Sequence, residues 1–427
     1  MKSDLDRLMS ERGYDALLVT GASVNNPPMY YLANGAKVGE ITVLVKPRGR
    51  PAVIFANSME REEAARSGLE VVDQNKYGLV QLLKEEKGDR RRAVARQIGL
   101  MLADAHVRGT VAAYGTRDQG AGHALLSAIE ELHPDLRIVG EFADTVLDLA
   151  MATKDAAEVK RIRAAGRKTV KVVAATEEFL LSHRAEKGVL VKKDGSRLTV
   201  GDVKGHIRQS LLQQGVVDAE DGPIFAIGRD GGVPHARGTD RDPNALGKPI
   251  VFDIFPNEAG GGYFYDFTRT WCLGYAPPEV EKAYADVLAV FQQVVRALKP
   301  GELCRAYQKM TCDLLEARGH PTIQSQPQTT SGYVHSLGHG IGLRVHESPR
   351  MADVEGNNDR LDPGAVFTVE PGVYYPERGF GIRIEDSLWL NPDTLKFETL
   401  ANYSKRLVLP VKQAGGRKKA AGSPRRR

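Results

Sequence analysis

Apolar and polar positions alternate at two different periods along the chain, which predicts interleaved helices and strands. Near the start, short segments of each kind follow one another between polar, glycine-containing turns. These are a helix at residues 5–9 and strands at residues 16–20, 41–45 and 52–55. No nucleophile, ligand cluster or phosphate loop accompanies them. We therefore expect residues 1–150 to form an α/β domain that shapes a neighbouring site or an oligomer contact.

Longer helices are predicted beyond a boundary near Thr153. Asp155 and Glu158 have the spacing of a capping box, which opens a helix that continues through Leu180. Further helices are predicted at residues 199–214, 278–298 and 302–318. Strand-rich segments with many glycines lie between and after them, and no short repeat is visible. We expect residues 151–412 to form a second, α+β domain.

Two acidic residues interrupt consecutive apolar strand patterns in the second domain. Asp253 and Asp266 each fall within a run of apolar or aromatic residues, and the glycine-rich segment 256–262 is predicted to join the two strands as a hairpin turn. An ionised carboxylate in such surroundings is costly unless it is hydrogen-bonded or bound to a cation. The alternative is structural: a turn aspartate, and a second aspartate paired with Arg269.

Three of the ten histidines, His335, His339 and His346, fall within one glycine-rich stretch of the chain. The glycines disfavour a helix, so the spacing of His335 and His339 does not indicate two ligands on one helical face. We expect His339 to be a metal ligand and the other two to donate hydrogen bonds. A lone histidine would more simply be a core residue, but the clustering favours a site.

Two further acids follow in strand patterns of the same domain. Glu370 ends the apolar run 366–369, and Glu385 lies inside the alternating run 381–386. Taken singly, either could be a salt-bridged strand residue. Together with Asp253, Asp266 and His339 they form a set of four carboxylates and one imidazole, which requires about two divalent cations for neutralisation. Such an oxygen-rich set with one nitrogen suits Mn²⁺, Co²⁺ or Zn²⁺.

Length, charge and cysteine usage narrow the class of protein. A chain of 427 residues is long enough for two cores. Of the net charge of +5, six positive charges lie in the segment 413–427, which we expect to be a disordered tail. The rest is near neutral, so we expect no specific nucleic-acid partner. The start resembles no signal peptide and no window predicts a membrane span. Three cysteines without a CxxC spacing suit a reducing cytoplasm.

The order, spacing and context of these residues resemble the M24 metallopeptidases, whose Xaa-Pro members include prolidase and aminopeptidase P. The resemblance rests on the runs 253–270, 335–346, 370–372 and 383–386. It implies a creatinase/prolidase-like N-terminal domain before a pita-bread catalytic domain. One departure is that Asp253 and Asp266 stand 13 positions apart, farther than usual in the family. The longer segment puts the shape of the site mouth in question, not the metal ligands.

The resemblance also implies a role for each site residue. Asp253 and Asp266 would chelate one ion, Asp266 and Glu385 would bridge the two ions, and His339 and Glu370 would complete the ligands of the other ion. Glu370 would also shuttle the proton. The residues implied to contact the substrate are His235 and His346 at the reacting carbonyl, and His335 and Arg383 in substrate binding.

The function implied is hydrolysis of the Xaa-Pro bond by a water that bridges two divalent metals, most simply Mn²⁺, in a dipeptidase. We expect a proline-containing peptide substrate and a cytoplasmic homodimer without a membrane partner. The alternatives are an aminopeptidase P, another small-amide or organophosphate hydrolase of the fold, and a non-catalytic binding or scaffold protein.

Overall fold

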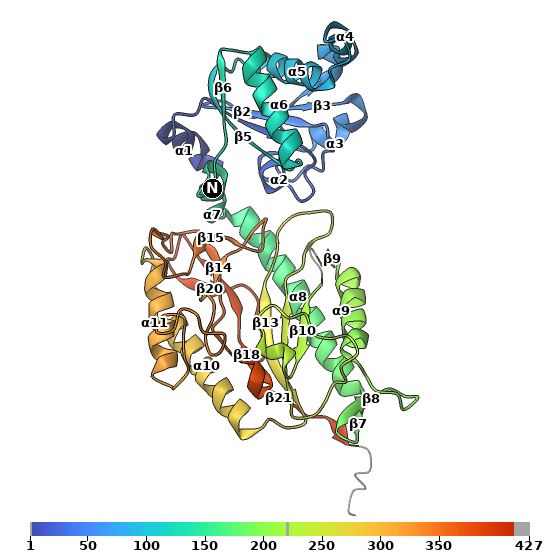
Figure 1. Cartoon of the computed structure of the whole chain (residues 1–427), viewed down its shortest axis with the longest axis vertical. Helices are drawn as coiled ribbons and strands as arrows, with labels where there is room; N and C mark the ends of the chain where they lie inside the picture. Colours follow the sequence, from blue (N-terminus) through green and yellow to red (C-terminus); the bar gives the residue numbers. More distant parts are fainter. Residues whose placement is uncertain (1, 219–221, 414–427) are drawn as a thin grey trace, which may run out of the picture.

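A six-stranded mixed sheet forms the centre of the N-terminal part of the protein (Figure 1). The computed structural model describes residues 2–218 and 222–413. The sheet order is β4-β3-β2-β1-β5-β6, with β1 antiparallel to β2 and parallel to β5. The strands are β1 (Ala16–Thr20), β2 (Val43–Pro47), β3 (Val53–Ala56), β4 (Glu70–Asp73), β5 (Gly109–Gly115) and β6 (Leu136–Val139). The helices are η1 (Lys2–Asp4), α1 (Leu5–Glu11), α2 (Pro27–Leu32), η2 (Ser58–Glu60), α3 (Arg61–Ala65), η3 (Gln74–Tyr77), α4 (Leu79–Glu85), α5 (Arg90–Asp104), α6 (Gln119–Leu132) and α7 (Val146–Ala152).

The central strand β1 is buried on both faces because its side chains alternate between two cores. Leu17 and Val19 belong to one hydrophobic cluster, whereas Ala16 and Leu18 belong to another. A continuous apolar run is typical of such a strand, covered on both sides. The predicted first helix and first strand are confirmed, and the next two strands begin within two residues of their predicted starts.

The second part places strands between two pairs of helices (Figure 1). Its larger sheets have the orders β10-β11-β13-β21 and β15-β14-β16-β19-β20. The strands are β7 (Arg184–Glu186), β8 (Val189–Val191), β9 (Val216–Val217), β10 (Ile224–Ile227), β11 (Pro249–Ile254), β12 (Asn257–Glu258), β13 (Phe267–Leu273), β14 (His339–Gly340), β15 (Glu347–Arg350), β16 (Val366–Val369), β17 (Gly372–Tyr375), β18 (Phe380–Arg383), β19 (Asp386–Leu390), β20 (Phe397–Thr399), β21 (Val408–Leu409) and β22 (Lys412–Gln413). The helices are α8 (Ala156–Ser182), α9 (Val200–Gln214), η4 (Asp230–Gly232), α10 (Pro278–Ala297), α11 (Cys304–Glu316) and η5 (Pro376–Arg378).

Each helix pair covers its own hydrophobic core. Along β13, Trp271 and Leu273 point into the core beneath α8 and α9, whereas Cys272 points into the core beneath α10 and α11. The four long helices agree with those predicted, and α8 begins with the capping box of Asp155 and Glu158. The strands that separate the two cores are therefore fixed from both sides.

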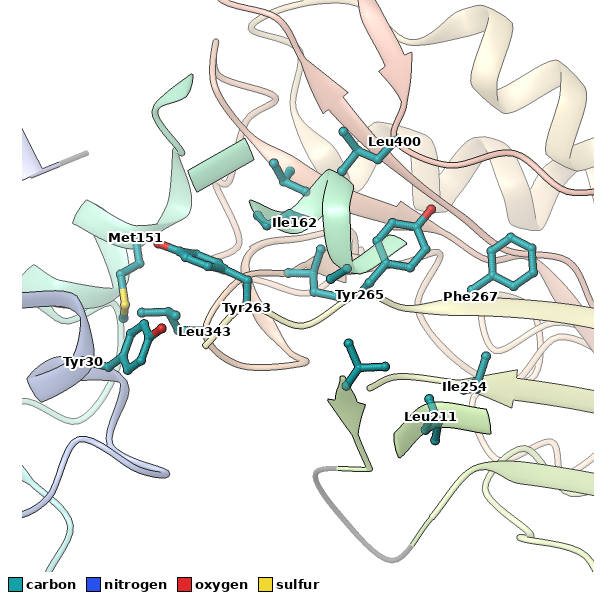
Figure 2. Packing of buried hydrophobic residues seen from close by; sticks show 14 of the residues in the cluster. Tyr30, Met151, Ile162, Leu211, Ile254, Tyr263, Tyr265, Phe267, Leu343 and Leu400 are labelled. Atoms are coloured by element: carbon teal, nitrogen blue, oxygen red, sulfur yellow. The ribbon is translucent and has the colours of Figure 1, made fainter. Parts of the chain in front are cut away.

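One core crosses from the N-terminal part into the second part (Figure 2). Tyr30 and Met151 lie in the same cluster as Tyr263, Tyr265 and Leu343, all of them buried. The domain boundaries themselves stay a prediction, and residues 414–427 of the predicted tail lie outside the described residues. Among the described residues, no helix is long and apolar enough to cross a bilayer.

Two strand predictions at the acidic residues are wrong. Asp266 directly precedes β13 instead of lying within it, because Pro256 has no N–H to donate to Tyr265 O, although Tyr265 N still donates to Pro256 O in register with β11. The predicted hairpin turn also contains the short strand β12, which pairs with β9, while a bridge between Asn257 and Phe264 keeps the two arms of the hairpin together. Glu385 lies in a break between β18 and β19, where its backbone N–H donates to Thr268 O over 3.1 Å.

Candidate metal centre and active site

Asp253 is the acid that β11 places on the site, and one of its two carboxylate oxygens is held by an arginine. The strand lies between β10 and β13, and the carboxylate is buried. Arg383 Nη2 donates to Asp253 Oδ2 over 2.5 Å, whereas Asp253 Oδ1 has no hydrogen-bond partner among the described residues. One oxygen is thus positioned, and the other is available to a ligand.

Asp266, His339 and Glu385 form a compact group of three buried or half-buried side chains. One ligand atom from each lies within 4.8 Å of the others, a separation that suits a common metal ion. His339 Nδ1 faces Gly340 O at 3.0 Å, so Nε2 faces the acids, 3.7 Å from Asp266 Oδ2. Thr268 Oγ1 donates to Glu385 Oε2 over 2.8 Å, and Glu385 Oε1 meets no partner in the described part of the chain.

Glu370, the residue directly after β16, completes this group of side chains. Its Oε1 lies 3.2 Å from His339 Nε2 and accepts a 3.3 Å hydrogen bond from Thr368 Oγ1. The same hydroxyl accepts from the backbone N–H of His339 over 3.1 Å. Thr368 therefore fixes the imidazole and the carboxylate relative to each other.

The charges of this group are strongly coupled. Burial and the nearby Asp253 raise the pKa of Asp266 well above its ordinary value, and burial and Asp266 do the same to Glu385. Burial alone would lower the pKa of His339, but the hydrogen bond and charge of Glu370 raise it to about 9. For Glu370, His339 outweighs the effect of burial and lowers the pKa to about 2.

These residues fit divalent metal binding. Asp253 Oδ1 and Glu385 Oε1 are buried without a hydrogen-bond partner among the described residues, which would be costly in the absence of a cation. The donors are carboxylates and one imidazole nitrogen, as divalent ions of the first transition row prefer. The alternative of an Asp266–Arg269 pair is wrong, because Arg269 Nη2 pairs with Asp386 Oδ1 over 2.7 Å in the buried interior.

A cavity of about 690 Å³ opens beside this group. All the predicted site residues line it except Glu385, which is buried behind the wall. The lining set is His235, Asp253, Asp266, His335, His339, His346, Glu370 and Arg383. Its volume lies in the range of sites for small organic ligands.

A tyrosine that the sequence pattern did not single out connects two of the predicted substrate residues. Arg383 Nη1 donates to the hydroxyl of Tyr374 over 2.8 Å, and this hydroxyl lies 2.9 Å from His335 Nε2. His335 Nδ1 lies 2.7 Å from Ser336 O, which places the proton on Nδ1. Burial lowers the pKa of His335, so the ring is neutral and accepts from Tyr374 at Nε2.

His346 and His235 approach the cavity from different segments. The His346 ring lies 4.4 Å from the His339 ring, centroid to centroid, in an edge-on arrangement. His235 follows Pro234, whose carbonyl accepts from Arg383 Nη1 over 3.2 Å. The structure thus brings every predicted site residue to one place.

Two arginines beside His346 were also missed. Arg344 Nη1 lies 2.5 Å from Asp148 Oδ1, and Arg350 Nη2 lies 3.0 Å from Asp144 Oδ1, and all four residues line the cavity. Their proximity to His346 in the sequence was the available signal, whereas nothing local marked Tyr374, Thr268 or Thr368.

Fold and site together define a metalloenzyme with a buried carboxylate-rich centre facing a substrate-sized cavity. The profile of metallopeptidase family M24 matches residues 160–392, more than half of the chain. The chain belongs to this family and is a metallopeptidase, and the divalent metal site is in keeping with both findings.

Relatives and solved structures extend the likeness to both parts of the chain. Probable dipeptidase PepE of Mycobacterium tuberculosis is 29% identical over 374 residues, 85% of either chain. The Xaa-Pro dipeptidase of Lactobacillus delbrueckii subsp. lactis is 34% identical over 211 residues, 48% of this chain and 51% of the relative. The structure of the Xaa-Pro dipeptidase from Bacillus anthracis covers 95% of this chain and 99% of its own, with a TM-score of 0.73 and 22% identity. The predicted fold class, an α/β N-terminal domain and a pita-bread catalytic domain, is confirmed.

Proposed function

We propose that this metallopeptidase is an Xaa-Pro dipeptidase that works with two divalent ions, Mn²⁺ in the first instance. The observation that carries the proposal is the joint placement of four carboxylates and His339 around two partnerless carboxylate oxygens beside the cavity. The names of the relatives, dipeptidase and Xaa-Pro dipeptidase, support this substrate class.

The five acidic and imidazole side chains would hold the ions between them. Asp253 and Asp266 would bind one ion, Asp266 and Glu385 would be shared, and His339 and Glu370 would bind the other. When bound, two such ions supply a nucleophilic water at neutral pH and polarise the carbonyl that is attacked.

The remaining chemistry falls to side chains of the chain itself. Glu370, whose pKa is lowered to about 2 in the metal-free site, is ionised and would take a proton from the attacking water and return it to the leaving nitrogen. His346 and His235 line the cavity and would donate hydrogen bonds to the carbonyl oxygen as it gains negative charge. His335 and Arg383 would shape the pocket for the substrate.

Two arginines that line the cavity favour a dipeptide over a longer peptide. Arg344 and Arg350 line the cavity and would place positive charge beside the carboxylate that directly follows proline in a dipeptide. Asp148 and Asp144 hold these arginines from the segment that leaves the N-terminal part, and Asp359 also pairs with Arg350. A longer peptide has no carboxylate at that point and would leave the arginines without this contact.

The substrate test compares Ala-Pro, Ala-Pro-Ala and Ala-Ala with protein stripped of metal and reloaded with Mn²⁺, Co²⁺ or Zn²⁺. We expect cleavage of Ala-Pro, fastest with Mn²⁺. Preference for the tripeptide would identify an aminopeptidase P, and failure to cleave any of them would refute an Xaa-Pro peptidase.

Light scattering tests the expected homodimer. Three free, buried cysteines support the reducing cytoplasm as its location.

A further inference from the structure

A fully buried ion pair joins the segment between α7 and α8 to the residue after His346. Lys154 Nζ lies 2.8 Å from Glu347 Oε2, and the two side chains are 1% and 3% exposed. A buried pair gains little net stability, because the cost of removing both charges from water offsets their attraction. Stability alone therefore does not explain why a buried ion pair lies at this position.

The second oxygen of Glu347 holds the loop that carries His346. Glu347 Oε1 accepts from the backbone N–H of Leu343 over 2.7 Å and from that of Arg344 over 3.0 Å. The carboxylate also lies against Gly342, where an added Cβ would meet Oε2 at 2.4 Å. These contacts close a short loop around His346, and they depend on where the carboxylate is held.

Lys154 is itself anchored to the strand that leads to Glu370. Its backbone N–H donates to Gly364 O over 2.9 Å, and Thr153 forms a bridge with Ala365, directly before β16. On the other side of the loop, Leu343 is buried in the core shared with Met151 and Tyr30 (Figure 2). One residue of the connecting segment thus touches the segments of both Glu370 and His346.

We propose that Lys154 is a positioning residue, which fixes His346 at the cavity through the carboxylate of Glu347. The inference rests on the proposed function, in which His346 contacts the substrate carbonyl. Lys154 touches no substrate in this arrangement. Loss of the ammonium group frees Glu347 to turn toward solvent or toward Arg344, and the loop then loses the acceptor for its two backbone donors.

The first test follows the loop itself and needs no activity. Hydrogen exchange is measured in Lys154→Met, in Glu347→Gln and in Lys309→Met, a control at an exposed ion pair with Asp313 on α11. We expect faster exchange of the amides of Leu343 and Arg344 in the first two variants, with β16 and β19 unchanged. Glu347→Gln keeps the volume but loses the charge that holds the side chain to Lys154, so it serves if Lys154→Met does not fold. Unchanged exchange at these amides in a folded variant overturns the proposal.

The second test asks whether Lys154 acts through His346. Lys154→Met is made in the unmodified protein and in His346→Ala, each loaded with metal, with Ala-Pro as substrate. We expect kcat to fall about 10- to 100-fold with KM nearly unchanged in the first case, and less than about twofold in the second, because coupled residues are not additive. An equal fall in both backgrounds shows a general structural role and overturns the proposal. If the unmodified protein cleaves no Xaa-Pro substrate, the proposed function fails, while the exchange measurement still decides the role of Lys154.

Discussion

Arg383 Nη2 donates a 2.5 Å hydrogen bond to Oδ2 of Asp253, and Oδ1 of the same carboxylate meets no partner among the described residues. The guanidinium is also held by Tyr374 and by the carbonyl of Pro234. It therefore orients the acid and leaves the second oxygen available to a ligand, as residues behind metal ligands commonly do.

Arg383→Lys should weaken metal binding about 10- to 100-fold, because a lysine keeps the charge but loses the fork that reaches both Asp253 and Tyr374. Competition with a chelator measures the affinity. Arg378→Lys is the matched control, since Arg378 is exposed and pairs with Glu279 away from the site. Equal metal affinity in Arg383→Lys and the unmodified protein would refute the orienting role.

Thr368→Val should reduce both metal affinity and activity about tenfold, because the hydroxyl positions His339 and Glu370 at once. The control is Thr311→Val, the same substitution at a buried threonine of α11, whose hydroxyl donates to Tyr307 O. We expect this control to lower the free energy of unfolding by about 1 kcal/mol without weakening metal binding. Chelator competition and urea unfolding separate the two effects, and equal metal affinities in both variants would contradict the assignment.

Metal removal should leave a site whose stability depends on pH. In the metal-free protein burial opposes the charge on His339, but Glu370 outweighs it and raises the pKa to about 9. This pKa lies above the value of about 6.5 in the unfolded chain. The interaction of protonated His339 with Glu370 therefore stabilises the folded protein fully below about pH 6.5, and this stabilisation is lost as the pH rises through about 9. Urea unfolding of chelator-treated protein should show this loss.

The metal-loaded protein should not show it, since an ion held by His339 would displace the proton from its imidazole. Chelator-treated His339→Gln should lack the part of the slope that His339 contributes, while the buried Asp266 and Glu385 keep their own part. The same slope in loaded and metal-free protein would exclude His339 as a ligand.

Gly166→Ala should lower the free energy of unfolding by about 1–3 kcal/mol, because the new Cβ would meet the buried ring of Tyr265 at 2.6 Å. Tyr265 directly precedes Asp266, so activity should fall as well. Gly205→Ala is the helical control: it has no neighbour within 4 Å and should stabilise the protein slightly. Thermal unfolding of both variants decides the matter, and an unchanged melting temperature in Gly166→Ala would contradict the close packing.

Local signals explain what could be predicted from the sequence. The capping box of Asp155 and Glu158 and the apolar spacing of the long helices are encoded within a few residues, so these elements were predicted correctly. The acids stood out because charged groups interrupt apolar strand patterns, and His339 stood out because three histidines cluster in one glycine-rich stretch. The chemistry of four carboxylates and an imidazole predicts a metal site from the sequence alone.

Long-range contacts explain what was missed. Glu385 leaves its strand because its backbone pairs with Thr268, a residue 117 positions earlier, and no local pattern encodes that contact. Nothing in the local sequence distinguishes the residues whose hydroxyls support the site, because only the fold brings these hydroxyls to the acids. These residues are Thr268, Thr368 and Tyr374. The same holds for Lys154, whose partner Glu347 lies 193 positions away.

The most direct test of the central claim is a metal titration with Ala-Pro hydrolysis followed in the same samples. Metal-stripped protein is titrated with Mn²⁺ beside Asp266→Asn, and bound metal is counted per chain. The account predicts that activity appears as two ions bind, and that Asp266→Asn, lacking the shared ligand, loses both binding and hydrolysis. Absence of bound metal, or full activity in Asp266→Asn, would contradict it.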